Sequence, residues 1–366
     1  ARLKEILATE SLRMQIIIDE TLEIKEKYGD ARKAQIVAAE GEMRIEDLIE
    51  EEDVAITISH MGYVKRTPLT EYRRQGRGGK GSKGGATRDE DFIEHIFIAS
   101  THDTMLFFTQ MGKCFWLPVY QIPEGTRTSK GRAIQNMISL PPEDKVMAYI
   151  DIHDLEDEAF INGHYLVFCT KKGTIKKTTV EAFSRPRANG IVAINIEEGD
   201  ELLEVRLTNG NCEIMLAVKS GRAIRFPEEK VRPMGRTATG VIGIDLANDQ
   251  DEVVGMITVE KGDKEQTILV VSEKGYGKRS HLIDPETGED EYRITNRGGK
   301  GVTTIKITPK TGNLIAIKDV TDRDDLMIIC ESGMTIRTGV EALRVMGRAT
   351  QGVRLIDLRG DDRIAS

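Results

Sequence analysis

Residues 213–225 read Glu213-Ile-Met-Leu-Ala-Val-Lys-Ser-Gly-Arg-Ala-Ile-Arg225: an apolar run, a Ser-Gly turn and a second run ending in a basic residue. The short apolar run, and the glycine that supplies the positive φ of a tight turn, predict a β-hairpin. The pattern occurs six times, with 48–61 residues between successive turn glycines. These glycines are Gly62, Gly112, Gly173, Gly221, Gly275 and Gly333. Such a period is typical of a repeat architecture, whose units pack on their neighbours.

A second glycine follows each turn, 19 residues later in four of the six repeats. These are Gly81, Gly131, Gly190, Gly240, Gly301 and Gly352. A short apolar stretch follows the later ones, and a further apolar run such as 253–259 comes next, so we expect four strands per repeat. Six such repeats predict an all-β fold, a six-bladed propeller-like ring of four-stranded blades preceded by a short N-terminal helix. A β-solenoid is the alternative, but its repeats would be shorter and more uniform.

The first 52 residues differ from the repeats. A helix is expected over 1–29, with Ser11 as its cap and Gly29 at its end, followed by an acidic connector over 30–52. Because a lone helix is marginal in water, its apolar side should pack against a domain outside this sequence. The ring is expected over 53–366, with blades near 53–100, 102–152, 163–209, 212–260, 266–321 and 324–366.

Composition excludes several classes of protein. No apolar run approaches the roughly 18 residues of a membrane span, which favours a soluble, intracellular chain. The cysteines lack Cys-x-x-Cys spacing and are expected as buried, reduced thiols; the histidines include no His-x-x-x-His pair, so no metal site is indicated. The cysteines are Cys114, Cys169, Cys212 and Cys330.

Charge is unevenly distributed. The chain carries a formal net charge of −8, but residues 1–53 hold 8 Lys/Arg and 15 Asp/Glu, so the repeats are close to neutral. Between Gly62 and Arg88 there are eight basic residues and one acid, Glu71. The eight are Lys65, Arg66, Arg73, Arg74, Arg77, Lys80, Lys83 and Arg88.

A basic residue also stands four positions past the turn glycine in five of the six repeats, often with a basic neighbour before it. The set comprises Arg66, Lys177, Arg225, Arg279 and Arg337, with Trp116 in the second repeat and the neighbours Lys65, Lys176 and Lys278. Equivalent positions in a ring lie at equivalent places on its perimeter, so these residues predict a belt of positive charge suited to a curved polyanion. The alternative is solvated Lys and Arg that protect strand edges from pairing.

The basic cluster centres on a glycine-rich loop, residues 75–85. It contains a formal Gly-x-Gly-x-x-Gly at Gly76, Gly78 and Gly81, but it follows Glu71-Tyr-Arg-Arg74 within a β repeat and not an apolar strand, and no Gly-Lys-Ser/Thr ends it. A dinucleotide or P-loop site is therefore not indicated. A better interpretation is that this loop contacts DNA phosphates through its backbone amides and cationic side chains.

At these residues the chain resembles the family of C-terminal domains of the DNA gyrase A protein, whose marker is the box Gln-Arg-Arg-Gly-Gly-Arg/Lys-Gly. Six positions match, and Gly76 replaces the first Arg of the box. The matching residues are Gln75, Arg77, Gly78, Gly79, Lys80 and Gly81. A second, degenerate copy, Asn296-Arg-Gly-Gly-Lys-Gly301, contributes Arg297 and Lys300.

The resemblance implies a six-bladed β-pinwheel whose neighbouring blades exchange strands and which wraps double-stranded DNA. Its DNA-binding residues would be the box together with the belt and the cations Arg73, Arg74, Lys83, Arg297 and Lys300. It further implies part of an ATP-hydrolysing type II topoisomerase, an isomerase that introduces negative supercoils. This region would hold no catalytic residue, metal or cofactor, because ATP and magnesium act elsewhere in the holoenzyme.

The implied partners are DNA, the N-terminal cleavage domain of the same polypeptide, and the gyrase B protein in an A2B2 complex, with no membrane; the implied location is the bacterial cytoplasm, at the nucleoid. Two alternatives remain: the equivalent domain of topoisomerase IV, in which the box is usually eroded, and a protein-interaction propeller without enzymatic context.

Overall fold

The computed structural model describes residues 2–30, 46–69, 91, 93–126, 129–263, 265–330, 335–358 and 362–364. Its contacts divide the chain into two compact units, Ala1–Leu48 and Ile49–Ser366, which are described separately below.

The first unit contains helices α1 (Arg2–Ala8) and α2 (Glu10–Tyr28) and the 3-10 turn η1 (Glu46–Leu48). Gly29 ends α2 as expected, its amide donating to the Lys25 carbonyl at 2.8 Å. The expectation that Ser11 caps the helix is wrong, because Glu10 is already helical and Thr9 holds the cap position. Neither helix buries a residue, and apolar side chains such as Leu7, Ile17 and Ile24 are exposed. Among the described residues, no helix combines the length and apolarity needed to cross a membrane.

The second unit is built from the expected hairpins. All six hairpins pair without a register shift, and the five turn glycines that the structure describes have φ between +78° and +84°. The hairpins are β1 (Asp53–Ser59) with β2 (Tyr63–Pro68), β4 (Thr104–Thr109) with β5 (Lys113–Pro118), β8 (Tyr165–Thr170) with β9 (Thr174–Thr179), β12 (Cys212–Val218) with β13 (Arg222–Pro227), β16 (Thr267–Ser272) with β17 (Tyr276–His281), and β20 (Asp325–Ile329) with β21 (Thr335–Gly339).

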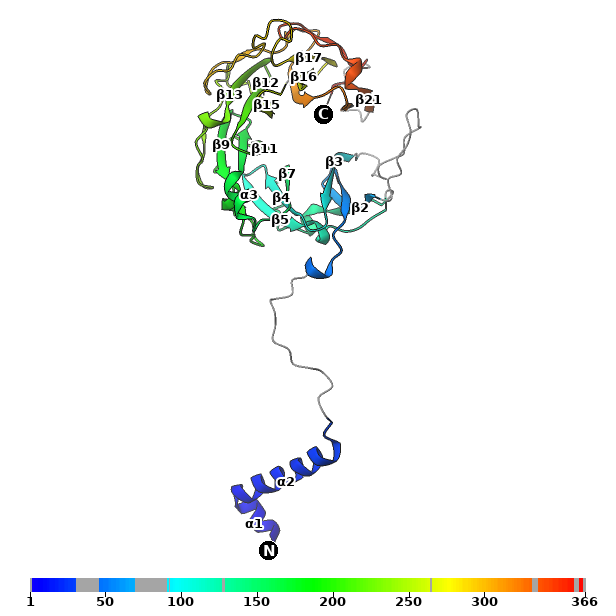
Figure 1. The fold of residues 1–366 in the computed structure, drawn as a ribbon, viewed down its shortest axis with the longest axis vertical. Helices are drawn as coiled ribbons and strands as arrows, with labels where there is room; N and C mark the ends of the chain where they lie inside the picture. The colour runs from blue at the N-terminus through cyan, green and yellow to red at the C-terminus, as the bar shows by residue number, and fades with distance from the viewer. Residues whose placement is uncertain are drawn as a thin grey trace. The chain divides into compact units, whose positions relative to one another are not determined.

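A third strand pairs with the first strand of each of these hairpins, apart from β20–β21. These strands are β3 (Ile93–Ser100), β7 (Val146–Ile152), β11 (Leu202–Thr208), β15 (Val253–Glu260) and β19 (Leu314–Val320). Figure 1 shows β11 and β15 on the inner side of the ring, with β9 and β13 on its outer side.

The outermost strand of each four-stranded sheet comes from the next repeat. The orders are β3-β1-β2-β6, β10-β5-β4-β7, β11-β8-β9-β14, β15-β12-β13-β18 and β19-β16-β17-β22, all antiparallel. The outermost strands have two residues each: β6 (Arg132–Ala133), β10 (Ile191–Val192), β14 (Val241–Ile242), β18 (Val302–Thr303) and β22 (Val353–Arg354). Neighbouring blades therefore exchange strands.

Short helical segments lie in the connections. The 3-10 turns η3 (Val119–Gln121), η5 (Val180–Phe183), η6 (Glu228–Lys230) and η7 (Val340–Ala342) directly follow the second hairpin strand, η4 (Ile134–Asn136) follows β6, and α3 (Glu158–Gly163) precedes β8. Asp157 caps α3, its carboxylate accepting from the amides of Ala159 and Phe160.

Each second glycine that the structure describes lies just before the strand that is donated to the neighbouring sheet. Gly301 has φ +68°, and a Cβ there would lie 2.4 Å from the Ala223 carbonyl oxygen of the sheet that receives the strand. A Cβ at Gly131, Gly240 or Gly352 would likewise lie 2.4–2.6 Å from a main-chain oxygen of the preceding repeat. Glycine is thus needed both for its conformation and for the close approach.

The core lies between successive sheets. In the cluster between the third and fourth sheets, Val167 and Cys169 of β8 pack with Ile214 and Leu216 of β12. β12 is buried along its whole length, because one face meets this cluster and the other meets the next one. This explains why the hairpin runs are continuously apolar and do not alternate.

In the part of the sixth repeat that the structure describes, β20 and β21 form a two-stranded sheet, and Cys330 is bridged to Ile364. Its Ile328 and Val340 pack against Leu269 and Val271 of the fifth sheet. All four cysteines are free and buried, as expected, and burial raises the pKa of each thiol.

Gly301→Ala should lower the free energy of unfolding by more than about 2 kcal/mol, because alanine disfavours positive φ by about 1–2 kcal/mol and its Cβ would clash with the Ala223 oxygen. Gly262→Ala is the matched control: φ is +83° there, but no atom lies within 4 Å of the added Cβ. Urea unfolding followed by circular dichroism measures both. Equal losses would contradict a steric role for the exchange glycine.

Candidate nucleic-acid interface

The side chain four residues past the turn glycine reaches into the next repeat. In the first five repeats it donates a hydrogen bond of 2.8–3.3 Å to a main-chain carbonyl oxygen there. The donors Arg66, Trp116, Lys177, Arg225 and Arg279 meet the oxygens of Ile122, Phe183, Glu228, Tyr292 and Val340, respectively. Trp116 uses an uncharged indole N–H, so the shared property is a long donor side chain and not a positive charge.

Carboxylates accompany the buried guanidinium groups at this position. Arg225 places its Nε 2.7 Å from the Glu213 carboxylate and its Nη1 3.2 Å from Asp290. Arg279 pairs with Asp322 at 2.6 Å. Since an unpaired buried charge is strongly unfavourable, these carboxylates make the burial tolerable.

The position three past the turn glycine carries a buried lysine in alternate repeats. Lys65 donates to the carbonyl oxygens of Thr126 and Ser129, Lys176 to those of Ala193 and Arg236, and Lys278 to that of Gly347. Burial lowers the pKa of Lys65, that of Lys176 to about 7, and that of Lys278 to about 8. These lysines hold segments of the following repeats to the hairpin.

The expectation of an exposed belt is therefore wrong for six residues. Lys65, Lys176, Lys177, Arg225, Lys278 and Arg279 are buried. Their ammonium and guanidinium groups satisfy carbonyl oxygens 51–69 residues away in sequence, which no local pattern reveals. Arg66 is half-buried and lies 3.4 Å from Glu124, and Arg337 is exposed but pairs with Asp325.

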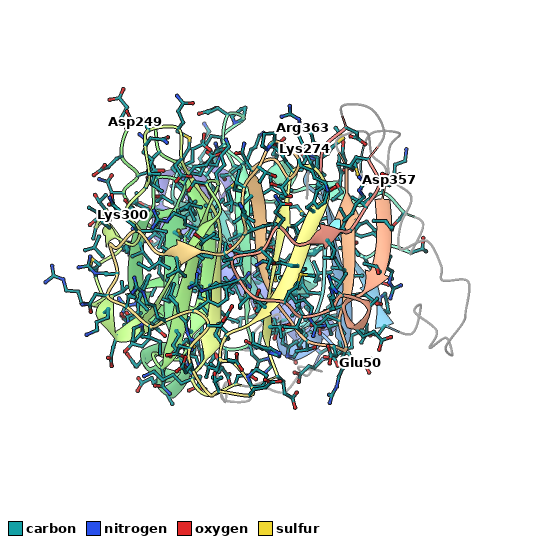
Figure 2. All side chains as sticks on the ribbon, turned by 90° about the horizontal axis from the view of Figure 1, so that it is seen from above. Glu50, Asp249, Lys274, Lys300, Asp357 and Arg363 are labelled. Atoms are coloured by element: carbon teal, nitrogen blue, oxygen red, sulfur yellow. The ribbon has the colours of Figure 1, made fainter. Side chains whose placement is uncertain are left out.

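The box lies outside the described residues, as do Arg73, Arg74 and Lys83. Its degenerate copy is described. There Gly298 has φ +77°, and Arg297 donates to the carbonyl oxygens of Lys230 and Ile242 at 3.1 and 3.0 Å. Lys300 is exposed, and Figure 2 places it on the outer wall at mid-height, between the face with Asp249 and Lys274 and the face with Glu50.

Exposed cations concentrate in the eight residues before each second glycine, which we call the basic segments: 123–130, 182–189, 232–239, 293–300 and 344–351. Together they contain eleven Lys/Arg and one acid, Glu124. The exposed ones among the described residues are Lys130, Arg185, Arg187, Arg232, Arg293, Lys300 and Arg344, while Arg236, Arg297 and Arg348 are half-buried. Each segment leads into an outermost strand, so these cations lie on the outer wall.

Main-chain hydrogen bonds link one basic segment to the region just past the previous one. Asn195 donates to Ala238, Asp245 to Gly299 and Lys306 to Thr350, at 3.0–3.3 Å, and each donor lies five residues past a second glycine. Arg348 adds a bond of 3.1 Å to the Thr303 oxygen of β18, as Arg297 does to β14. These bonds connect the four segments from 182–189 to 344–351 in series. We call the row of all five basic segments the track, and its signal in the sequence is the number of Lys and Arg residues just before each second glycine.

Comparison with known proteins agrees with this geometry. The family model described as the DNA gyrase C-terminal domain, a beta-propeller, matches residues 53–100, 103–148, 164–209, 213–260, 266–321 and 324–366. The chain belongs to this family.

Curated relatives are named as the A protein of DNA gyrase. The one from Staphylococcus epidermidis is 45% identical over 365 residues, and that from Salmonella typhimurium is 43% identical over 351 residues. The matches cover 100% and 96% of this chain but 39% and 38% of those proteins, so the chain spans about two fifths of their length.

Two solved structures share the fold. The C-terminal domain of DNA topoisomerase IV matches with a TM-score of 0.71 and 26% identity, covering 87% of this chain and 93% of that one. A DNA gyrase A C-terminal domain matches with a TM-score of 0.66 and 24% identity, covering 86% and 98%.

The buried lysines make stability depend on pH. Because the pKa of Lys176 is about 7 in the folded ring and 10.5 ordinarily, the unfolded chain binds more protons between these values. The free energy of unfolding should therefore rise with pH from 7 towards 10.5, and below pH 7 this lysine adds no dependence. Lys176→Met should flatten the rise in urea unfolding, whereas Lys172→Met, at an exposed lysine, should keep it. An unchanged rise in the first variant would contradict the assignment.

Proposed function

We propose that this chain is the DNA-wrapping domain of a DNA gyrase A protein, which bends duplex DNA around its outer wall. The observation that carries the proposal is the set of basic segments, with eleven cations and one acid on consecutive blades. The overall charge of −8 does not oppose this, since phosphates respond to local charge within a Debye length of about 10 Å.

Bending stiff duplex around a small ring costs several kcal/mol, which phosphate contacts and released counterions must offset. The track supplies these contacts without base-specific geometry, so affinity should depend on salt and little on sequence. We further propose six blades in the complete ring; the six segments matched by the family model support this count beside the five four-stranded sheets described.

The box would extend the track onto the first blade. Residues 73–80, which contain most of it, also immediately precede a second glycine, Gly81, and carry four cations and no acid. This is the same place in the repeat as the basic segments. We propose that Arg73, Arg74, Arg77, Lys80 and the neighbouring Lys83 contact DNA and hold the wrap closed.

The remaining parts of the proposal follow from the relatives' name. The chain would act in a bacterial, cytoplasmic type II topoisomerase that uses ATP, with the catalytic residues, magnesium and ATP in other parts of the holoenzyme. The cleavage domain of the same polypeptide and the gyrase B protein would be its protein partners, and the exposed apolar side chains of α2 offer a surface for the first. Topoisomerase IV is the second candidate, favoured by its structural match.

Supercoil trapping tests the wrapping function. The chain is added to nicked circular DNA, the nick is ligated, and the linking number is measured on gels after the protein is removed. A shift of one sign that grows with the amount of protein is expected, because each wrapped turn is trapped by ligation. An unchanged linking number alongside measurable binding would overturn wrapping and favour the topoisomerase IV type of domain.

Replacing Arg232 and Arg344 by Ala tests the track. Both are exposed in equivalent basic segments, so the negative slope of log affinity against log salt should become shallower by about 2, at about 0.9 per lost phosphate contact. Lys261→Ala with Lys318→Ala is the matched control: it removes the same charge from exposed positions outside the basic segments, Lys318 lying on the innermost strand β19. The slope is measured by fluorescence anisotropy. Equal slopes for the two double variants would exclude the track as the interface.

A further inference from the structure

A cavity of 660 Å³ opens beside β22, the outermost strand of the fifth sheet. Its walls come from the β16–β17 turn, the loop before β19, the outermost strand β22 and the segment 362–364. The last of these is held in place by the Ile364 amide, which donates to the Glu273 carbonyl at 3.0 Å. The cavity is thus built from two adjacent repeats.

Positive charge dominates the lining, with four cationic and two carboxylate side chains. The cations are Lys274, Lys310, Arg354 and Arg363, and the carboxylates are Asp357 and Asp362. Arg354 already pairs with Asp357, at 2.6 Å. Figure 2 shows Lys274 and Arg363 on the same face of the ring, away from the mid-height position of Lys300.

Tyr276 organises the cations. Arg354 is its partner in the β17–β22 ladder and donates to its hydroxyl at 3.3 Å, with the guanidinium carbon 5.8 Å from the ring centroid. The Lys310 Nζ lies 5.3 Å from the same centroid. The hydrogen bond and positive charge of Arg354, with the charge of Lys310, lower the pKa of this phenol. Lys274 is oriented separately, by a 2.7 Å bond to the Pro309 carbonyl.

Ammonium and guanidinium groups that converge on an open cavity beside a hydroxyl suit phosphate oxygens. The cavity is also continuous with the track, because Arg354 lies two residues past Gly352, where the basic segment 344–351 ends. We propose that this cavity binds backbone phosphates of the wrapped DNA where the duplex passes from the outer wall onto the hairpin-turn face at the fifth blade. The inference rests on the proposed wrapping function and adds the place where the duplex leaves the track.

The test removes two exposed lining cations by Lys310→Ala with Arg363→Ala, with Lys261→Ala and Lys318→Ala as the charge-matched control. On a duplex of roughly one persistence length, about 150 base pairs, the negative salt slope of the cavity variant should become shallower by about 2. The control should keep the wild-type slope. The cavity variant should also trap fewer supercoils per molecule, since the duplex would leave the ring along a less fixed path.

The outcomes separate the two levels of the proposal. If the wild-type chain traps no supercoils, the wrapping function fails. If the wild type traps supercoils and the cavity variant matches the control in slope and trapping, only the exit site fails.

Inorganic pyrophosphate distinguishes DNA from a free phosphate compound. At matched ionic strength it should compete with DNA binding by the wild type more than by the cavity variant. Calorimetric binding of pyrophosphate that the variant abolishes, without any change in DNA binding, would assign the cavity to a free phosphate compound and overturn the DNA assignment.

Discussion

Each sheet of the ring is completed by two residues from the following repeat, and the rest of the structure depends on this exchange. A two-residue ladder is a small contact, so further donors reinforce it. Lys176 and Arg225 extend from the hairpins to carbonyl oxygens near the incoming strands, and Gly301 lets the chain approach without a side chain in the way. The apolar clusters between the sheets complete the attachment. A single repeat lacks its outermost strand and part of the acceptors for its own buried cations, so it depends on its neighbours.

Two groups of Lys and Arg residues in the ring therefore have different physical roles. The buried ones on the hairpins donate hydrogen bonds across the junctions between repeats, and some of them also pair with a carboxylate, as Arg225 does with Glu213. Those in the basic segments, such as Arg232 and Arg344, remain in solvent with almost no acid beside them. Net charge cannot distinguish these groups, because both contribute equally to it. Of these two groups, the second is the one that phosphates can reach.

Local features of the sequence predicted the hairpins, because an apolar run and a glycine with positive φ are properties of neighbouring residues. The roles of the hairpin cations could not be predicted in this way: the oxygen that receives Lys176 belongs to Arg236, sixty residues away. Trp116 carried the useful signal, since a tryptophan among arginines at one repeat position indicates a shared donor and not a shared charge. The basic segments could have been predicted from the sequence. Residues 232–241 (RPMGRTATGV) resemble residues 344–353 (RVMGRATQGV), and acids are nearly absent just before each second glycine.

The amide-to-carbonyl bonds that link a basic segment to the region just past the previous one, such as Asp245 to Gly299, involve no side chain. The curve that the ring offers to a bound polymer thus depends on backbone bonds and buried contacts, while the strength of the hold depends on individual exposed residues. Evolution can strengthen or weaken the hold of one blade by exchanging a single arginine, without moving the blades on either side. Rings with the same curvature can in this way differ in how tightly they hold a bound polymer.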